Sequence, residues 1–233
     1  MQAIILVGGY GTRLKPYSDY IPKPMFPLGH EPILEHTIKW LKKYKIKEIV
    51  ISSSYLSEDI KEYFKDGKNI GVNITHITSK RPLGTAGQLK RTEKVLKKSF
   101  IALYGDSIFN FSISKALKYH NEKKSFLTMV LNYYETTFKY GFIKLDNRNK
   151  IKEWDEKPIM KGLINTGFYI MNRNVMEYIP KNRKYEMNSL IYDLIKQKKN
   201  IYGYTIKNDI IDIGNKDAYS IARRNYMDKR VKK

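Results

Sequence analysis

The sequence predicts an α/β fold, a Rossmann-like doubly wound mixed sheet, and three observations support this prediction. The chain opens on a short apolar run that ends at a pair of glycines. Strand-like and helix-like segments then alternate through the first half, and strand-like segments dominate the second half. A chain of 233 residues can bury one full core but is short for two independent ones. We therefore expect residues 1–233 to form a single domain.

The first half predicts repeated βαβ units. Residues 2–7 are rich in Ile, Leu and Val, which is typical of a strand buried on both faces. Apolar side chains at helical spacing predict a helix over residues 33–43, and Ser57 followed by two acidic residues is typical of a helix start. The remaining expected elements are strands over 48–52, 72–77 and 99–104 and a helix over 85–98. Ligands of such sheets bind at the carboxyl ends of strands, where the turns 8–13 and 105–106 are expected.

The second half has a different pattern. Its expected strands are 126–133, 139–146, 150–154, 163–171, 200–206 and 209–213. Its expected helices are 113–122, 187–198 and 215–227. Because no linker, repeat or low-complexity run interrupts it, we expect this half to extend the same sheet and to lay a substrate-binding lobe over it.

The charge balance is strongly basic, with 44 Lys and Arg against 23 Asp and Glu, a net charge of +21. The lysines are spread along the chain in short clusters, which favours a solvated basic surface on a protein that handles anions. A nucleic-acid-binding protein is the competing non-enzyme hypothesis, and it predicts salt-sensitive binding to RNA or DNA.

Cysteine is absent, and the four histidines are scattered. These observations exclude disulfides, thiolate zinc sites and cysteine nucleophiles, and they do not favour a histidine metal site. The N-terminus lacks the pattern of a signal peptide, and no segment approaches membrane-spanning length. We expect a cytoplasmic protein without a membrane partner.

Closely spaced glycines follow the first strand, at Gly8, Gly9 and Gly11. Backbone N–H groups in such a loop can cradle phosphates, and the forked guanidinium of Arg13 suits phosphate oxygens. Leu14 stands where a Rossmann fingerprint needs glycine, and the Gly-Lys-Ser/Thr of a Walker A loop is absent. For the glycines alone, a tight βα turn without a ligand remains an alternative.

Lys23 lies between two prolines. Proline fixes its own φ and restricts the residue before it, so this backbone is stiff and favours an ammonium group held at a fixed place near the glycine loop. A surface loop is the alternative interpretation.

Seven motifs in order resemble the sugar nucleotidyltransferase family. They are Gly8-Gly9-Tyr10-Gly11-Thr12-Arg13-Leu14, Pro22-Lys23-Pro24-Met25, Arg81-Pro82-Leu83-Gly84-Thr85-Ala86-Gly87, Gly105-Asp106, Glu156-Lys157-Pro158, Asn165-Thr166-Gly167 and Ile211-Asp212-Ile213-Gly214. The resemblance covers nearly the whole chain and is strongest with the short mannose-1-phosphate and heptose-1-phosphate guanylyltransferases. It implies the nucleotide-diphospho-sugar transferase fold, with residues 1–110 as a nucleotide-binding half and residues 111–233 as a sugar-binding half.

The resemblance also implies roles for the matched residues. Arg13 and Lys23 would hold the β- and γ-phosphates, and Asp106 and Asp212 would share a Mg²⁺, an ion that two carboxylates and phosphates can hold. Arg13, Lys23 and Asp106 are the predicted catalytic residues. The other predicted nucleotide contacts are Leu6, Gly8, Gly9, Gly11, Thr12, Ser79, Pro82, Gly84 and Thr85. The predicted sugar-phosphate contacts are Gly141, Glu156, Lys157, Asn165 and Thr166, with Lys157 on the phosphate.

The implied reaction transfers a nucleotidyl group from a nucleoside triphosphate, GTP by resemblance, to a heptose or mannose 1-phosphate and releases pyrophosphate. The attacking phosphate oxygen is already anionic, so the reaction needs positioning and charge neutralisation rather than a general base. Ser107 is not part of a Gly-x-Ser-x-Gly elbow, which argues against a hydrolase. The resemblance is compatible with a homodimer.

The nucleotide base stays open. Guanylyltransferases of this kind usually carry an acidic residue where this chain has Ser79, and a hydroxyl can donate or accept. One alternative is a dTTP- or UTP-dependent glucose-1-phosphate nucleotidyltransferase. Another is a CTP:phosphocholine-type cytidylyltransferase, for which Tyr133, Tyr134 and Tyr140 could supply an aromatic cage.

Overall fold

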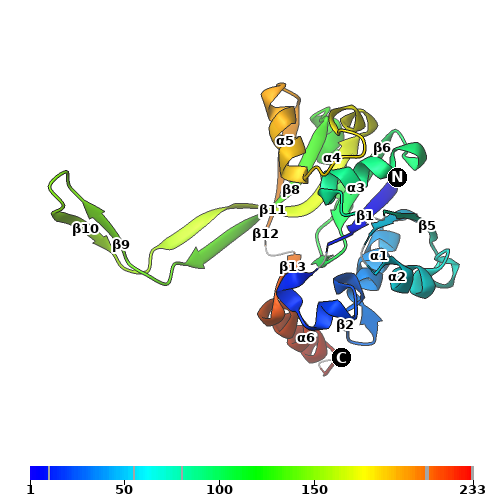
Figure 1. Cartoon of the computed structure of the whole chain (residues 1–233), viewed down its shortest axis with the longest axis horizontal. Helices are drawn as coiled ribbons and strands as arrows, with labels where there is room; N and C mark the ends of the chain where they lie inside the picture. The colour runs from blue at the N-terminus through cyan, green and yellow to red at the C-terminus, as the bar shows by residue number, and fades with distance from the viewer. Residues whose placement is uncertain (10, 55, 80, 208–209, 232–233) are drawn as a thin grey trace.

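A seven-stranded sheet with the order β12-β8-β11-β6-β1-β4-β5 forms the centre of the molecule (Figure 1). The computed structural model describes residues 1–9, 11–54, 56–79, 81–207 and 210–231, apart from the side chains of Arg13, Asp212, Asn225 and residues 227–231. The sheet strands are β1 (Gln2–Val7), β4 (Glu48–Ser53), β5 (Asn73–Thr78), β6 (Ser99–Tyr104), β8 (Leu127–Thr137), β11 (Ile159–Asn172) and β12 (Ile201–Lys207). Neighbours among β6, β1, β4 and β5 pair in parallel, whereas β11 runs antiparallel to both β6 and β8. The predicted doubly wound mixed sheet is confirmed.

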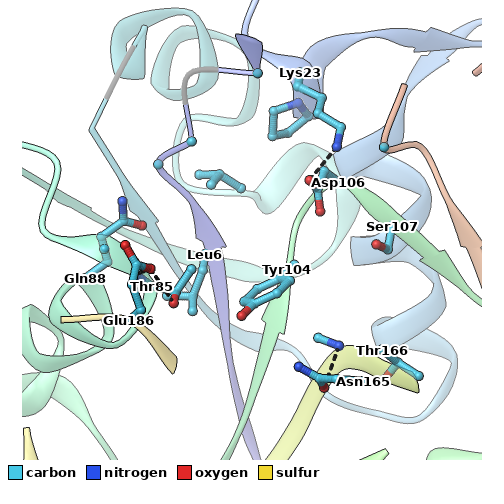
Figure 2. A pocket seen from close by; sticks show the side chains of 18 of the residues that line it. Leu6, Lys23, Thr85, Gln88, Tyr104, Asp106, Ser107, Asn165, Thr166 and Glu186 are labelled. Carbon is cyan, nitrogen blue, oxygen red and sulfur yellow. Dashed lines mark hydrogen bonds and ion pairs between the residues drawn. The ribbon is translucent and has the colours of Figure 1, made fainter. Parts of the chain in front are cut away.

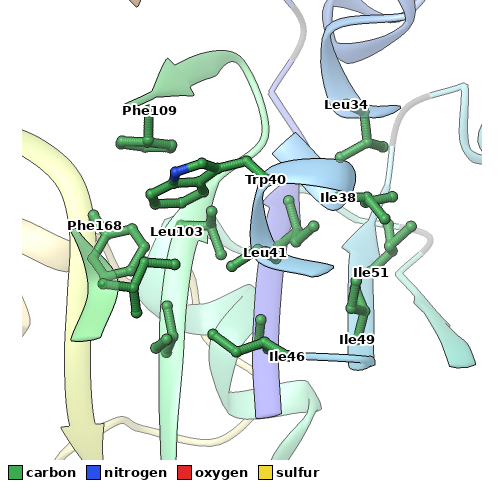
Figure 3. Packing of buried hydrophobic residues seen from close by; sticks show 14 of the residues in the cluster. Leu34, Ile38, Trp40, Leu41, Ile46, Ile49, Ile51, Leu103, Phe109 and Phe168 are labelled. Atoms are coloured by element: carbon green, nitrogen blue, oxygen red, sulfur yellow. The ribbon is translucent and has the colours of Figure 1, made fainter. Parts of the chain in front are cut away.

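Helices cover both faces of this sheet. They are α1 (Ile33–Lys43), α2 (Ser57–Phe64), α3 (Gly84–Arg91), α4 (Ile113–Glu122), α5 (Met187–Lys196) and α6 (Lys216–Val231). Side chains of a strand alternate between faces, so β1 sends Ile5 into one core and Leu6 into the other. The first core, seen in Figure 3, packs α1, α2 and α4 around Trp40 and Phe168, and the second packs α3 and α5.

Helix α3 is shorter than predicted. It ends at Arg91 rather than continuing to residue 98, and a short 3-10 turn (Glu93–Val95) follows. The hydroxyl of Thr92 donates to the carbonyl of Leu89 (2.7 Å), and the side chain of Gln2 bonds both the Val95 carbonyl and the Lys97 N–H. These bonds use backbone groups that a continued helix would need. The predicted bounds of the helix 33–43 are confirmed.

Short strand pairs complete the fold around the large sheet. They are β2 (Pro27–Leu28) with β3 (Glu31–Pro32), β7 (Ser107–Phe109) with β13 (Ile210–Asp212), and β9 (Phe142–Leu145) with β10 (Ile151–Asp155). A third apolar cluster joins α6 to the segment after the glycine loop through Leu14, Phe26 and Ala222. Among the described residues, no helix is both long and apolar enough to cross a membrane.

Residues 133–164, which we call the arm, project away from the sheet (Figure 1). Strand β12 accompanies β8 only as far as Tyr133, and beyond that point β8 and β11 continue as a two-stranded ladder to the β9–β10 hairpin. The expectation that the second half lays a lobe over the sheet is therefore wrong for this segment. The ladder between Ile159–Thr137 and Asn165–Leu131 is unbroken, which keeps the arm extended.

Candidate active site

A cavity of about 600 Å³ opens beside the carboxyl ends of β1 and β6 (Figure 2). These neighbouring parallel strands end at Val7 and Tyr104, so the glycine loop and Asp106 face the same space, as the sequence predicts for a doubly wound sheet. Twelve predicted site residues lie on its wall: Leu6, Gly8, Gly9, Gly11, Thr12, Lys23, Pro82, Gly84, Thr85, Asp106, Asn165 and Thr166.

The glycine loop is held close to two neighbouring elements. The Ser54 hydroxyl donates to the carbonyl of Gly8 (2.9 Å), and the amide of Gln88 lies against Gly8 so closely that a Cβ there would approach its Nε2 to 1.6 Å. Because Gly8 has no side chain, backbone and amide can approach this closely, whereas a Cβ would displace the flexible Gln88 side chain. The packing leaves a backbone-lined floor next to the cavity, as phosphate binding requires.

Lys23 and Asp106 form an ion pair on the cavity wall (Figure 2). The Nζ of Lys23 donates to Oδ2 of Asp106 at 2.6 Å. Lys23 is only 8% exposed, whereas the side chain of Asp106 is 34% exposed. A buried ammonium needs a partner of opposite charge, so the pair fixes both groups. The side chain of Arg13 lies outside the described residues.

The backbone places Asp212 beside Asp106. In the ladder of β7 and β13, Asp212 lies opposite Ser107, the residue that follows Asp106. The side chain of Asp212 lies outside the described residues. No group of three or more His, Cys, Asp or Glu that could hold a metal occurs within the part of the chain that is described. A partly exposed Asp106 suits Mg²⁺, which prefers one or two carboxylates together with phosphates and waters.

Glu186, which was not predicted as a site residue, joins one end of the cavity to α5. Its Oε2 accepts hydrogen bonds from the Thr85 N–H (3.0 Å) and hydroxyl (3.1 Å), and the Thr85 hydroxyl in turn accepts from the N–H of Met187 (2.8 Å). The starts of α3 and α5 are thereby tied together. Gly84, at φ +70, lies where a Cβ would come within 2.6 Å of the Tyr185 carbonyl. Glu186 stands just before a predicted helix, but nothing in the sequence pairs it with Thr85.

Gln88, rather than Ser79, lies on the wall beside the glycine loop. The Ser79 hydroxyl donates to the carbonyl of Arg81 (2.7 Å) and accepts from its N–H (3.3 Å), so it is used within its own turn. Gln88 is 5% exposed. Its side-chain amide offers both a donor and an acceptor at this end of the cavity.

The opposite end of the cavity is formed by a bulge in β11. The register of β11 against β8 shifts between Asn165 and Tyr169, and this bend turns Asn165 toward the cavity. Asn165 donates to the Tyr169 hydroxyl (2.6 Å) and accepts from the Gly167 N–H (3.1 Å), which fixes its amide. Thr166 donates to the carbonyl of Val130 (2.7 Å).

Two tyrosine hydroxyls lie next to this bulge, and burial raises the pKa of both. The hydroxyls of Tyr104 and Tyr169 are 3.4 Å apart. Burial is the largest cause of the raised pKa of each group. Both remain neutral hydroxyls at physiological pH, so Tyr104 presents an uncharged group to the cavity.

Gly141, Glu156 and Lys157 lie on the arm, away from the cavity. Oε2 of Glu156 accepts from the indole Nε1 of Trp154 (2.9 Å), and a Cβ on Gly141 would lie 2.8 Å from the same oxygen. Lys157 is exposed. The structure thus brings Gly141 and Glu156 together, but outside the chain's own cavity.

Comparisons with known proteins show what this chain is similar to. Residues 2–229 match the model of the family described as Nucleotidyl transferase. A D-glycero-alpha-D-manno-heptose 1-phosphate guanylyltransferase of Campylobacter jejuni is 38% identical over 200 residues, which cover 85% of this chain and 88% of that protein. A UTP–glucose-1-phosphate uridylyltransferase of Synechocystis is 30% identical across 100% of this chain but only 65% of that protein. The crystal structure of HddC from Yersinia pseudotuberculosis complexed with GMP-PN has a TM-score of 0.77 and 26% identity, with 97% of this chain and 99% of that chain covered.

Proposed function

This chain belongs to the nucleotidyl transferase family, and from that premise we propose that it transfers a guanylyl group from GTP to a sugar 1-phosphate of the heptose or mannose type. Its reaction class is that of the sugar-1-phosphate nucleotidyltransferases. The observation that carries the assignment to this cavity is the ion pair of Lys23 and Asp106 on a wall shared with the glycine loop.

The nucleotide would lie along the first half of the wall. Backbone N–H groups of Gly8, Gly9, Gly11 and Thr12 would face the triphosphate, with Lys23 as a cation beside it. The sequence motif adds Arg13 as a second cation. Gln88 would meet the base with its amide, and Glu186 would hold Thr85 and Gly84 in place against the same end.

Asp106 and Asp212 would hold Mg²⁺, which when bound neutralises phosphate charge. Asn165 and Thr166 would contact the sugar phosphate from the bulge in β11. These residues would bring the triphosphate and the sugar phosphate together and offset the repulsion between their negative charges. In-line attack at the α-phosphorus needs such positioning.

Two observations bear on the base. The relative with 38% identity is a guanylyltransferase, and the HddC structure contains GMP-PN. A uridylyl transfer is the second candidate, because Ser79 is used within its own turn and a relative that matches the whole chain is a uridylyltransferase. A phosphocholine substrate has less support, because the tyrosines proposed for its cage, Tyr133, Tyr134 and Tyr140, are absent from the cavity wall among the described residues.

A panel of substrates tests the proposal. Pyrophosphate release is measured with GTP, UTP, dTTP and CTP, each against heptose, mannose and glucose 1-phosphates and phosphocholine, with Mg²⁺ present. We expect the highest kcat/KM with GTP and a heptose or mannose 1-phosphate, and no turnover after chelation of divalent ions. Turnover with UTP or dTTP alone would reassign the base. No pyrophosphate release with any substrate pair, together with RNA binding that Asp106→Asn does not alter, would reject the enzyme and support a nucleic-acid-binding protein.

A further inference from the structure

The cavity lacks the motif that the sequence places on the sugar phosphate. Glu156 and Lys157 lie on the arm, and the path from Lys157 to Asn165 takes eight residue steps, most of them along the extended strand β11. At about 3.3 Å per strand residue this path is roughly 25 Å long. The β8–β11 ladder spans most of it, from Ile159–Thr137 to Asn165–Leu131. Lys157 therefore cannot reach the cavity of its own chain unless these strand pairs break.

The arm also exposes apolar side chains that a separate monomer would leave in water. Thirteen of the 23 exposed large hydrophobic side chains among the described residues lie within residues 133–164. They are Tyr133, Tyr134, Phe138, Tyr140, Phe142, Ile143, Leu145, Ile151, Trp154, Ile159, Met160, Leu163 and Ile164. A concentration of apolar surface on so short a segment marks a contact surface, because isolated exposed residues are common but extended apolar patches are not.

The charge of the arm allows a second copy of this chain as the partner. The whole chain carries 44 basic and 23 acidic residues, so two copies repel each other over most of their surface. The arm is close to neutral by comparison, with seven basic and five acidic residues. Lys144 pairs with Glu153 (2.6 Å) and Lys161 with Glu135 (3.1 Å) inside the arm. The arm is thus a surface on which two of these basic molecules can meet.

The backbone of the arm supplies a means of contact. On one side β11 pairs with β8 along the arm, but on the other side β6 pairs only with Phe168 to Asn172. Within the described ladders, the second edge of β11 from Ile159 to Asn165 is unpaired. An unpaired edge of this kind binds another strand through its backbone N–H and C=O groups. Antiparallel pairing of two such edges is compatible with a two-fold axis.

We propose that two copies of this chain exchange arms about a two-fold axis, so that Glu156 and Lys157 of the partner subunit complete each cavity. The β11 edges of the two arms lie side by side. Each hairpin extends away from the sheet and helices of its own subunit, which we call the body, and reaches the sugar-phosphate end of the partner's cavity. The exchange explains why the motif residues are distant from their own cavity and why the arm is apolar. The role given to Lys157 rests on the proposed function, whereas the exchange itself does not.

Mixing two inactive variants tests the exchange. Asp106→Asn removes a residue of the cavity, and Lys157→Ala removes one of the arm; each alone should lower kcat/KM about 100-fold or more. After refolding together at equal concentrations, half of the dimers are mixed, and each mixed dimer contains one cavity with Asp106 and a partner arm with Lys157. Recovery to about one quarter of wild-type activity is expected. If each arm folds back on its own body, no mixed dimer has a complete site, and the absence of recovery would overturn the proposal.

A second measurement, disulfide cross-linking, detects the exchange without an activity assay. The chain has no cysteine, and a Cβ at Gly162, in the middle of the open β11 edge, meets no atom within 4 Å. Gly162→Cys should form a disulfide-linked dimer on mild oxidation, whereas Lys118→Cys on exposed α4 should not. A monomer by native mass spectrometry, or equal cross-linking of both variants, contradicts the exchange. If Gly162→Cys forms the cross-linked dimer but the wild type shows no turnover in the substrate panel, the exchange stands and the proposed function is rejected.

Discussion

Strand β11 passes through two environments. From Phe168 to Met171 it is buried between β6 and β8, while from Ile159 to Ile164 it is exposed on the arm. Both parts have β-sheet hydrogen bonds to β8, so hydrogen bonding does not distinguish them. The difference is packing, because the buried part has helices and a third strand against it and the arm has neither. Burial fixes this part of the strand in place. The positions of Glu156 and Lys157 on the arm depend instead on what the arm contacts.

The largest expected effect contrasts an aromatic residue of the body with one of the arm. Phe168→Ala removes a fully buried ring that contacts Trp40, Phe109 and Phe111, and should lower the free energy of unfolding by about 3–5 kcal/mol. Trp154→Ala, on the exposed arm, should change it by less than about 0.5 kcal/mol at protein concentrations where the chain is monomeric. Urea unfolding at low concentration gives both values. Equal losses would show that the arm packs against its own body.

The next effect concerns charge in the cavity. Asp106→Asn keeps the size of the side chain but removes the charge that faces Lys23, and should lower kcat about 100- to 1,000-fold. Asp66→Asn is the matched control, because Asp66 forms an exposed ion pair with Lys68 (2.7 Å) outside the cavity. Steady-state pyrophosphate release measures both variants. Comparable losses of kcat in the two variants would contradict the proposal that the cavity is the active site.

A smaller effect is expected where two helices meet. Thr85→Val preserves volume but leaves Glu186 with one donor fewer and the Met187 N–H without its acceptor. The free energy of unfolding should fall by about 1–3 kcal/mol, and KM for the nucleotide should rise more than kcat falls. Thr75→Val on the exposed face of β5 serves as the control. An unchanged KM would show that the contact between Thr85 and Glu186 does not affect nucleotide binding.

The smallest effect is a pH dependence of stability. His120 is buried, its Nδ1 lies 2.8 Å from the Thr128 hydroxyl, and burial lowers its pKa below the usual value. As pH falls below about 6.5 the unfolded chain gains the proton first, so stability falls until the pH reaches the folded-state pKa. His120→Gln should reduce this slope, seen in thermal unfolding from pH 7.5 to 5.5. The exposed His30→Gln is the control, and an equal change in both would refute the assignment.

Local sequence pattern predicts the body well because local and tertiary forces agree there. The apolar spacing of residues 33–43 gives the observed bounds of α1, since the same face is buried against the sheet. The helix expected over 85–98 is too long, because the contacts of Gln2 that end the helical stretch come from a distant part of the chain. The pattern of residues near one another in sequence does not predict such long-range contacts.

The candidate site divides in the same way. Lys23 and Asp106 were predicted from proline restriction, strand ends and motif order, and they are in contact on the cavity wall. Glu186 was not predicted, because its partner Thr85 is 101 residues away in sequence. The arm could not be predicted, because strand propensity is the same for a strand that lies over the sheet and for one that leaves it. The binding roles of all these residues remain predictions.

If Lys23 binds the triphosphate and Asp106 the cation, as proposed, their ion pair would govern how these two ligands affect one another. In the free protein each charge already has its partner, so a cation that approaches Asp106 alone must compete with the ammonium group. A triphosphate that draws Lys23 toward itself would free Asp106 for the cation, and a cation bound to Asp106 would in turn free Lys23. The two should bind with positive cooperativity, and by thermodynamic linkage each strengthens the affinity for the other by the same factor. The free protein would then discriminate against bare metal ions and uncomplexed nucleotide in favour of the two together.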